Sequence, residues 1–100
     1  MNKPAPNIKG DLEISHDKNG IFIGGTPSGL KSLSNLLKWL AELDQEIENM
    51  PDGEREHVHL HVKNGNYGSL TKFSEETEIC RLDAKGNGAL PDYYKKKKNT

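Results

Sequence analysis

Cysteine is almost absent from the sequence, which excludes a disulfide-stapled fold. Cys80 is the only cysteine among 100 residues, so no intrachain disulfide can form. No apolar run approaches the roughly 20 residues that a membrane-spanning helix needs. The first residues carry two prolines and no apolar segment, unlike a secretory signal. We therefore expect a single-domain cytoplasmic protein that does not contact a membrane.

Motifs of common enzymes are missing as well. No serine lies in a Gly-x-Ser-x-Gly elbow, and the glycine-rich stretch 24–29 lacks the Gly-Lys-Ser/Thr ending of a phosphate-binding loop. Cys80 falls in an expected strand and is interpreted as a small buried residue. Most carboxylates crowd a surface segment where each stays ionised, which does not suit general acid–base work. The sequence thus predicts no enzyme, no catalytic residue and no cofactor.

A net charge of −1 hides an uneven distribution of charge. Residues 1–41 carry five lysines against three acids, and residues 57–100 carry eight basic residues against five acids. Residues 42–56, named here the acidic segment, carry seven acids against one arginine. Such a local excess can steer a basic partner. The candidate partner-binding carboxylates are Glu42, Asp44, Glu46, Glu48, Asp52, Glu54 and Glu56.

The N-terminal half predicts a hairpin followed by a helix. Residues 11–15 alternate polar and apolar, Asn19-Gly20 favours a tight turn, and residues 21–23 continue as a second strand. Thr26 is a good N-cap and Pro27 suits the first helical position. Leucines at spacings of three and four then predict a helix of about 20 residues with one buried stripe. The stripe is expected to comprise Leu30, Leu33, Leu37, Leu40, Leu43 and Ile47, with Leu36 and Trp39 at its rim.

Two further strands complete the predicted fold. Residues 57–62 alternate perfectly between histidine and apolar residues, and residues 77–82 read as a fourth strand. The order predicts an α+β, two-layer ββαββ fold, with one long helix packed on a four-stranded, mainly antiparallel sheet whose other face is open. The domain is expected to span residues 10–94, with a flexible lead-in at 1–9 and a disordered basic tail at 95–100. Because this lysine-rich tail lacks interleaved aromatics, nucleic acid is not predicted as a partner.

The three alternating histidines are the most conspicuous candidate site. If the apolar residues between them face the helix, His57, His59 and His61 share the opposite face. The outer two then lie roughly 13 Å apart, so they cannot readily share one ion, and a further ligand would have to come from another strand, such as Glu13. We therefore predict a solvated or partner-binding face and no metal. A small metal- or ligand-binding module that uses these histidines remains the alternative function.

Two stretches also resemble a known family. They are Gly20-Ile21-Phe22-Ile23-Gly24-Gly25-Thr26-Pro27-Ser28-Gly29-Leu30 with its leucine-rich helix, and Gly53-Glu54-Arg55-Glu56-His57-Val58-His59-Leu60-His61, with Phe73-Ser74-Glu75 and the stretch from Cys80 to Gly86 beyond. Across roughly residues 10–94 the sequence resembles immunity proteins of bacterial polymorphic toxin systems, a small family with a "GTP-x-GL" helix start and a His-rich strand.

This resemblance implies a non-enzymatic inhibitor that binds and occludes a cognate bacterial toxin, with no catalytic residues to carry over. The acidic segment would suit a nuclease toxin, because an active site that attracts phosphates tends to be basic. A homodimer that covers the open sheet face is a further hypothesis.

Overall fold

The computed structural model describes residues 2–94, so the basic tail predicted at 95–100 lies outside the described residues. The elements are β1 (Leu12–Asp17), β2 (Gly20–Gly25), α1 (Pro27–Glu42), the short 3-10 helix η1 (Gln45–Ile47), β3 (His57–Leu60) and β4 (Thr77–Cys80). Their order is the predicted one. Within residues 2–94, no helix combines the length and the apolar character that crossing a membrane requires.

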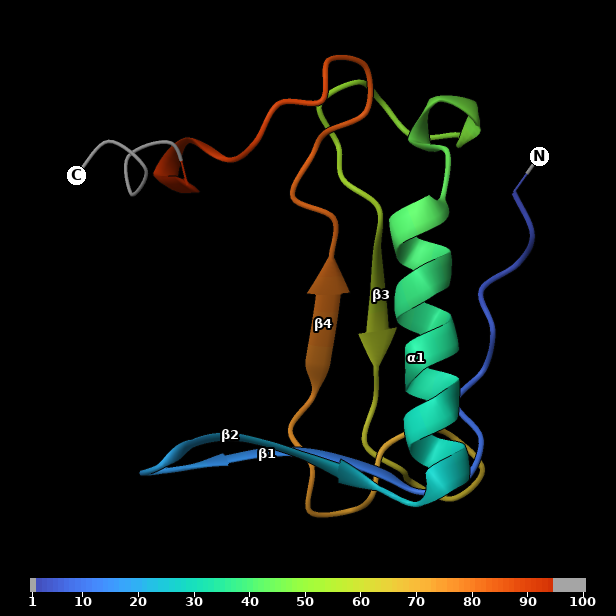
Figure 1. The fold of residues 1–100 in the computed structure, drawn as a ribbon, viewed down its shortest axis with the longest axis vertical. Coiled ribbons are helices and arrows are strands. Elements are labelled where there is room, and N and C mark those ends of the chain that lie inside the picture. The colour runs from blue at the N-terminus through green and yellow to red at the C-terminus, as the bar shows by residue number, and fades with distance from the viewer. Residues whose placement is uncertain (1, 95–100) are drawn as a thin grey trace.

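The strands form two separate sheets, so the predicted four-stranded sheet with one open face is wrong. β1 pairs with β2 and β3 with β4, both antiparallel, and Figure 1 shows the hairpin running across the lower end of the β3–β4 pair. The outer edge of β1 is bonded to a segment that belongs to neither sheet. There the main-chain oxygens of Leu12 and Ile14 accept hydrogen bonds from the amides of Thr71 and Glu75. An irregular segment thus occupies one of the two edges at which β3 or β4 could have joined the hairpin.

Helix α1 begins where the sequence predicted and ends earlier. Thr26 is the N-cap, its side chain accepts a hydrogen bond from the Gly29 amide at 3.2 Å, and Pro27 opens the helix. The helix ends at Glu42 after 16 residues, and the chain re-forms a single turn at η1. Asp44 separates the two because it is extended and its carboxylate caps η1 by accepting from the Glu46 amide. The prediction of one helix of about 20 residues is therefore wrong.

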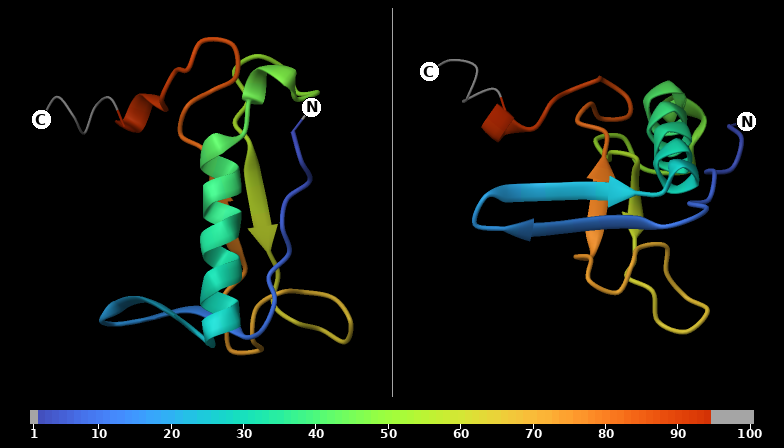
Figure 2. Two further views of the ribbon diagram at one scale, coloured as in Figure 1. Left: turned by 45° about the vertical axis from the view of Figure 1, so that its right-hand side comes forward. Right: turned by 60° about the horizontal axis from the view of Figure 1, so that its bottom comes forward.

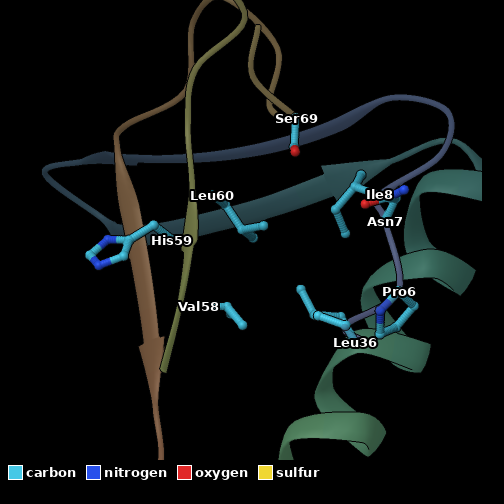
Figure 3. A pocket seen from close by; sticks show the side chains of 9 residues that line it. Pro6, Asn7, Ile8, Leu36, Val58, His59, Leu60 and Ser69 are labelled. Carbon is cyan, nitrogen blue, oxygen red and sulfur yellow. The ribbon is translucent and has the colours of Figure 1, made fainter. Parts of the chain in front are cut away.

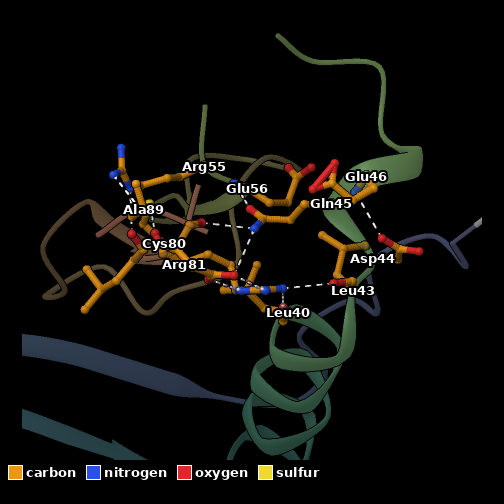
Figure 4. A network of polar contacts seen from close by, with 12 residues as sticks. Leu40, Leu43, Asp44, Gln45, Glu46, Arg55, Glu56, Cys80, Arg81 and Ala89 are labelled. Atoms are coloured by element: carbon orange, nitrogen blue, oxygen red, sulfur yellow. Dashed lines mark hydrogen bonds and ion pairs between the residues drawn. The ribbon is translucent and has the colours of Figure 1, made fainter. Parts of the chain in front are cut away.

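A guanidinium group connects the end of α1 to β4 (Figure 4). Arg81 Nη1 donates to the main-chain oxygens of Leu40 at 3.0 Å and Leu43 at 2.9 Å. Arg81 Nε and Nη2 donate to the Asp83 carboxylate at 2.8 and 2.6 Å. Since the last carbonyls of a helix have no partner within it, Arg81 satisfies oxygens that would otherwise need water.

The core lies between α1, β1 and the β3–β4 pair, which forms the second sheet. Its buried members are Leu12, Ile14, Leu33, Leu36, Leu60 and Leu70, flanked by Ile8, Trp39, Val58 and Ile79. The buried side of α1 is turned relative to the predicted stripe, because Leu30 and Leu37 are 45% and 42% exposed. A Cβ at Gly29 would collide with the Asp11 oxygen, so this glycine brings the first helical turn directly against the chain that enters β1. That close approach places Gly29 and Ser32, rather than Leu30, on the buried side.

The segment 2–9, expected to be a loose lead-in, lies along α1 (Figure 2, left). Trp39 Nε1 donates to the Lys3 oxygen at 2.7 Å, and the Lys9 amide donates to Ser32 Oγ at 3.0 Å. These bonds lie at opposite parts of the helix. The segment therefore runs beside α1 for most of its length.

Candidate functional site

The histidines of β3 lie on the exposed side of the second sheet, as the alternation predicted. Val58 and Leu60 point from β3 towards Leu36 and the N-terminal segment, whereas His59 points to the other side (Figure 3). A cleft of about 260 Å³ lies between these apolar side chains and the segment 5–8. The period of two in β3 thus separates an apolar inner face from an imidazole outer face.

β4 places carboxylates beside these imidazoles. His59 is paired with Glu78, with 3.8 Å between Nε2 and the carboxylate, and His61 Nδ1 lies 2.9 Å from the Glu76 carboxylate. The rings form a row along β3, with centroids 4.9 Å apart for His57 and His59 and 6.0 Å apart for His59 and His61. We name this surface the histidine–glutamate face; it comprises His57, His59, His61, Glu76 and Glu78.

The two glutamates were missed at the sequence level, although a signal for them exists. Side chains alternate along a strand, so Glu76, Glu78 and Cys80 share the face opposite to Ile79. Assigning Ile79 to the inward face would therefore have placed both carboxylates on the exposed side. The adjacent Ile79 and Cys80 obscured that register. Cys80 itself is exposed, so its interpretation as a buried residue is wrong.

Hydrogen bonds stabilise the charged form of one carboxylate on this face, that of Glu76. The Glu76 carboxylate accepts from the Val62 amide at 3.0 Å and contacts His61. The Val62 amide first, and then His61, hold the pKa of Glu76 below its usual value. The Glu76 carboxylate is therefore ionised at neutral pH and gives this face a fixed negative charge.

The acidic segment divides into structural and solvent-facing carboxylates. Asp44 caps η1, Glu46 accepts from the Gly86 amide at 2.8 Å, and Glu48 accepts from the Asn2 side chain at 2.6 Å. The remaining four, for which no side-chain hydrogen bond exists among residues 2–94, are Glu42, Asp52, Glu54 and Glu56. Among the described residues, only these four carboxylates of the acidic segment have no part in holding local structure.

Nearby cations engage main-chain oxygens rather than the acidic side chains. Lys85 Nζ donates to the oxygens of Glu48 at 2.7 Å and Met50 at 2.6 Å. Arg55 donates to the oxygens of Leu82 at 2.7 Å and Ala89 at 3.0 Å. Within residues 2–94, no salt bridge pairs a carboxylate of the acidic segment. Lys85 and Arg55 therefore leave the carboxylates of the acidic segment without a cationic side-chain partner among the described residues.

A groove joins the acidic segment to the histidine–glutamate face. It has a volume of about 340 Å³, and its polar walls include Glu48, Glu54, Glu56, Arg55 and His57. The groove therefore reaches only the first histidine of the face, His57, which follows Glu56 directly in the sequence. Glu42 lies apart, on the last turn of α1.

The imidazoles spread along β3 and do not converge. In the described chain, residues 2–94, no group of three or more His, Cys, Asp or Glu side chains is arranged to hold a metal ion. Glu13, the carboxylate named as a further ligand, instead accepts from Thr71 Oγ1 at 3.1 Å on the other sheet. What the face offers chemically is flat rings and carboxylates side by side.

Comparison with known proteins identifies no relative of this chain. No family model matches the chain, and neither the curated proteins nor the solved structures include one that matches it significantly.

Proposed function

We propose that the protein is a non-enzymatic inhibitor that binds a bacterial toxin in the cytoplasm and covers the toxin's active surface. The resemblance of residues 20–30 and 53–61 to immunity proteins suggests this role. The observation that carries the proposal is the exposed histidine–glutamate face, continued by the acidic groove. A protein that works by occlusion needs such an exposed surface and no reacting group.

The chemistry of the face selects a basic partner. A guanidinium group stacks on flat rings and binds carboxylates through paired N–H donors, so arginine complements this mixture of side chains. Glu76 holds its charge at neutral pH, and Glu54 and Glu56 extend the negative surface into the groove. A nuclease active site, built to attract phosphates, presents a basic surface of this kind. We therefore favour a nuclease as the toxin.

Growth protection tests the function directly. The gene that neighbours this one would be expressed in a bacterial host with and without the protein, and surviving colonies would be counted. The proposal predicts growth arrest by the neighbour and rescue by co-expression. A neighbour that does not arrest growth, or an arrest that the protein fails to relieve, would remove the proposal.

Charge reversal tests the surface. Glu54→Lys combined with Glu78→Lys should slow association with the toxin about tenfold at low salt, and the effect should shrink as salt rises. Glu46 and Glu48 are unsuitable for this purpose, because their carboxylates hold local structure. Asp92→Lys, at an exposed position with no side-chain hydrogen bond among residues 2–94, changes the net charge half as much as the double variant and is the matched control for each of its single substitutions. Equal association rates for the double variant and the control would contradict the docking role.

A further inference from the structure

Strand β2 presents an uncovered apolar edge. Ile21, Phe22 and Ile23 are 73%, 53% and 54% exposed, and the stretch Gly20–Gly25 contains no charged residue or proline. The right-hand view of Figure 2 shows the hairpin extending past β4. The loop that follows β3 lies on the β1 side of the hairpin, and β2 forms the opposite edge. Natural sheets normally protect such an edge with charge, proline or a covering segment. None of these protects β2 within residues 2–94.

The register shows which main-chain groups of β2 point outward. The Thr26 amide donates to the Asp11 oxygen at 3.0 Å, so this pair is hydrogen-bonded. Hydrogen-bonded and non-hydrogen-bonded pairs alternate along an antiparallel ladder, which makes Ile14–Ile23 and His16–Ile21 non-hydrogen-bonded pairs. The N–H and C=O groups of Ile21 and Ile23 therefore point away from β1. No hydrogen bond among residues 2–94 engages them.

The sequence of this edge is symmetric. Gly20-Ile21-Phe22-Ile23-Gly24 reads the same in both directions, so antiparallel pairing centred on Phe22 sets Ile21 opposite Ile23 of another copy. The two residues with outward main-chain groups thus face each other and form four hydrogen bonds around the axis. Phe22 meets its own counterpart in a close, non-hydrogen-bonded pair, an arrangement that favours aromatic contact.

We propose that the protein forms a two-fold dimer by antiparallel pairing of β2 with β2 of a second copy. The result is a continuous sheet in the order β1-β2-β2-β1. A two-stranded hairpin is only marginally stable in water, and the two strands of the second copy would stabilise the β1–β2 hairpin. Pairing stops at two copies because Thr71 and Glu75 occupy the outer edge of β1. Only one strand per copy is engaged, so the buried area falls below the about 1,200 Å² of standard interfaces, and we expect micromolar dissociation.

Cysteine cross-linking tests both the dimer and its register. In a Cys80→Ser background, Phe22→Cys places two thiols opposite each other with Cα atoms about 4.5 Å apart, within disulfide reach. Ile21→Cys is the matched control, since its counterpart lies diagonally about 7–8 Å away, too far to bridge. The dimer predicts at least tenfold faster oxidation to a covalent dimer for Phe22→Cys. Equal rates for the two variants would overturn the register and the proposal.

A proline variant tests the edge without a thiol. Ile23→Pro removes an N–H group that points outward and takes part in no bond of the hairpin, so the monomer should keep its circular dichroism spectrum. Light scattering from micromolar to millimolar concentration should show a monomer–dimer transition for the native protein and a monomer for the variant. A native protein that stays monomeric throughout, or a variant that dimerises equally well, would refute the proposal. If the variant unfolds, the cysteine pair decides.

Discussion

Replacing Arg81 by methionine should cost the protein a large share of its stability. Methionine keeps an unbranched apolar stem and removes every donor. Two hydrogen bonds to the oxygens of Leu40 and Leu43 and two to Asp83 are lost. A hydrogen bond to a charged group contributes about 1.5–3 kcal/mol when well buried. The Arg81 side chain is 19% exposed and that of Asp83 is 39% exposed, so solvent screens much of the ion pair.

With that discount, we expect a loss of about 2–4 kcal/mol in the free energy of unfolding, out of the roughly 5–15 kcal/mol typical of a domain. Urea unfolding followed by circular dichroism measures it, with a drop in Tm of about 10 °C or more as a second readout. Arg81→Lys is the control, because it keeps the charge and loses the forked geometry, so its loss should be smaller. A change below about 0.5 kcal/mol for Arg81→Met, at an unchanged m-value, would refute the argument that this group holds the end of α1.

The same contact predicts a pH dependence. Hydrogen bonds from Arg81 hold the pKa of Asp83 below its usual value. A carboxyl whose pKa is lowered by folding stabilises the protein above its unfolded pKa, and this contribution disappears as the pH falls through the lowered value. Asp83→Asn should therefore reduce stability at neutral pH and show a weaker further loss in acid. Identical acid unfolding curves for the variant and the native protein would contradict this coupling.

Three further predictions concern single positions. Gly29→Ala should destabilise by about 2 kcal/mol or more in urea unfolding, because its Cβ would collide with the Asp11 oxygen; a neutral change would show that the helix start can move. Thr26→Ala should lose about 1 kcal/mol by the same assay, since the N-cap bond is removed, and an unchanged midpoint would argue against that bond. Although Cys80 is exposed, partial desolvation of its thiol, and then Glu78, raise its pKa, so alkylation near pH 8 should be slower than for a free cysteine and faster in Glu78→Gln. Equal alkylation rates for both forms would exclude the carboxylate's effect.

Local signals predicted the features that depend on neighbouring residues. The turn after Asp17, the cap at Thr26 and the outward histidines of β3 all arise from chemistry within a few positions, and the structure shows each of them. The early end of α1 is also local, because Asp44 caps the next turn. It was overlooked because leucine spacing continues past that point.

Contacts between distant residues could not be predicted. The outer edge of β1 is closed by the segment 71–75, which has no strand pattern and yet bonds to β1. The hydrogen bond from Arg81 to the Leu40 oxygen of α1 joins residues 41 positions apart. Periodicity describes a segment's own faces and carries no information about which distant chain will meet them.

The bonds that hold β1 have a consequence for the nascent chain. Its hairpin emerges from the ribosome first, but the amides that cover its outer edge belong to Thr71 and Glu75, which follow much later. At about 5–20 residues per second, the hairpin waits several seconds with both edges bare. We expect the native arrangement of β1 to form only after residues 71–75 have been made, and the growing polypeptide to expose both edges of the hairpin until then.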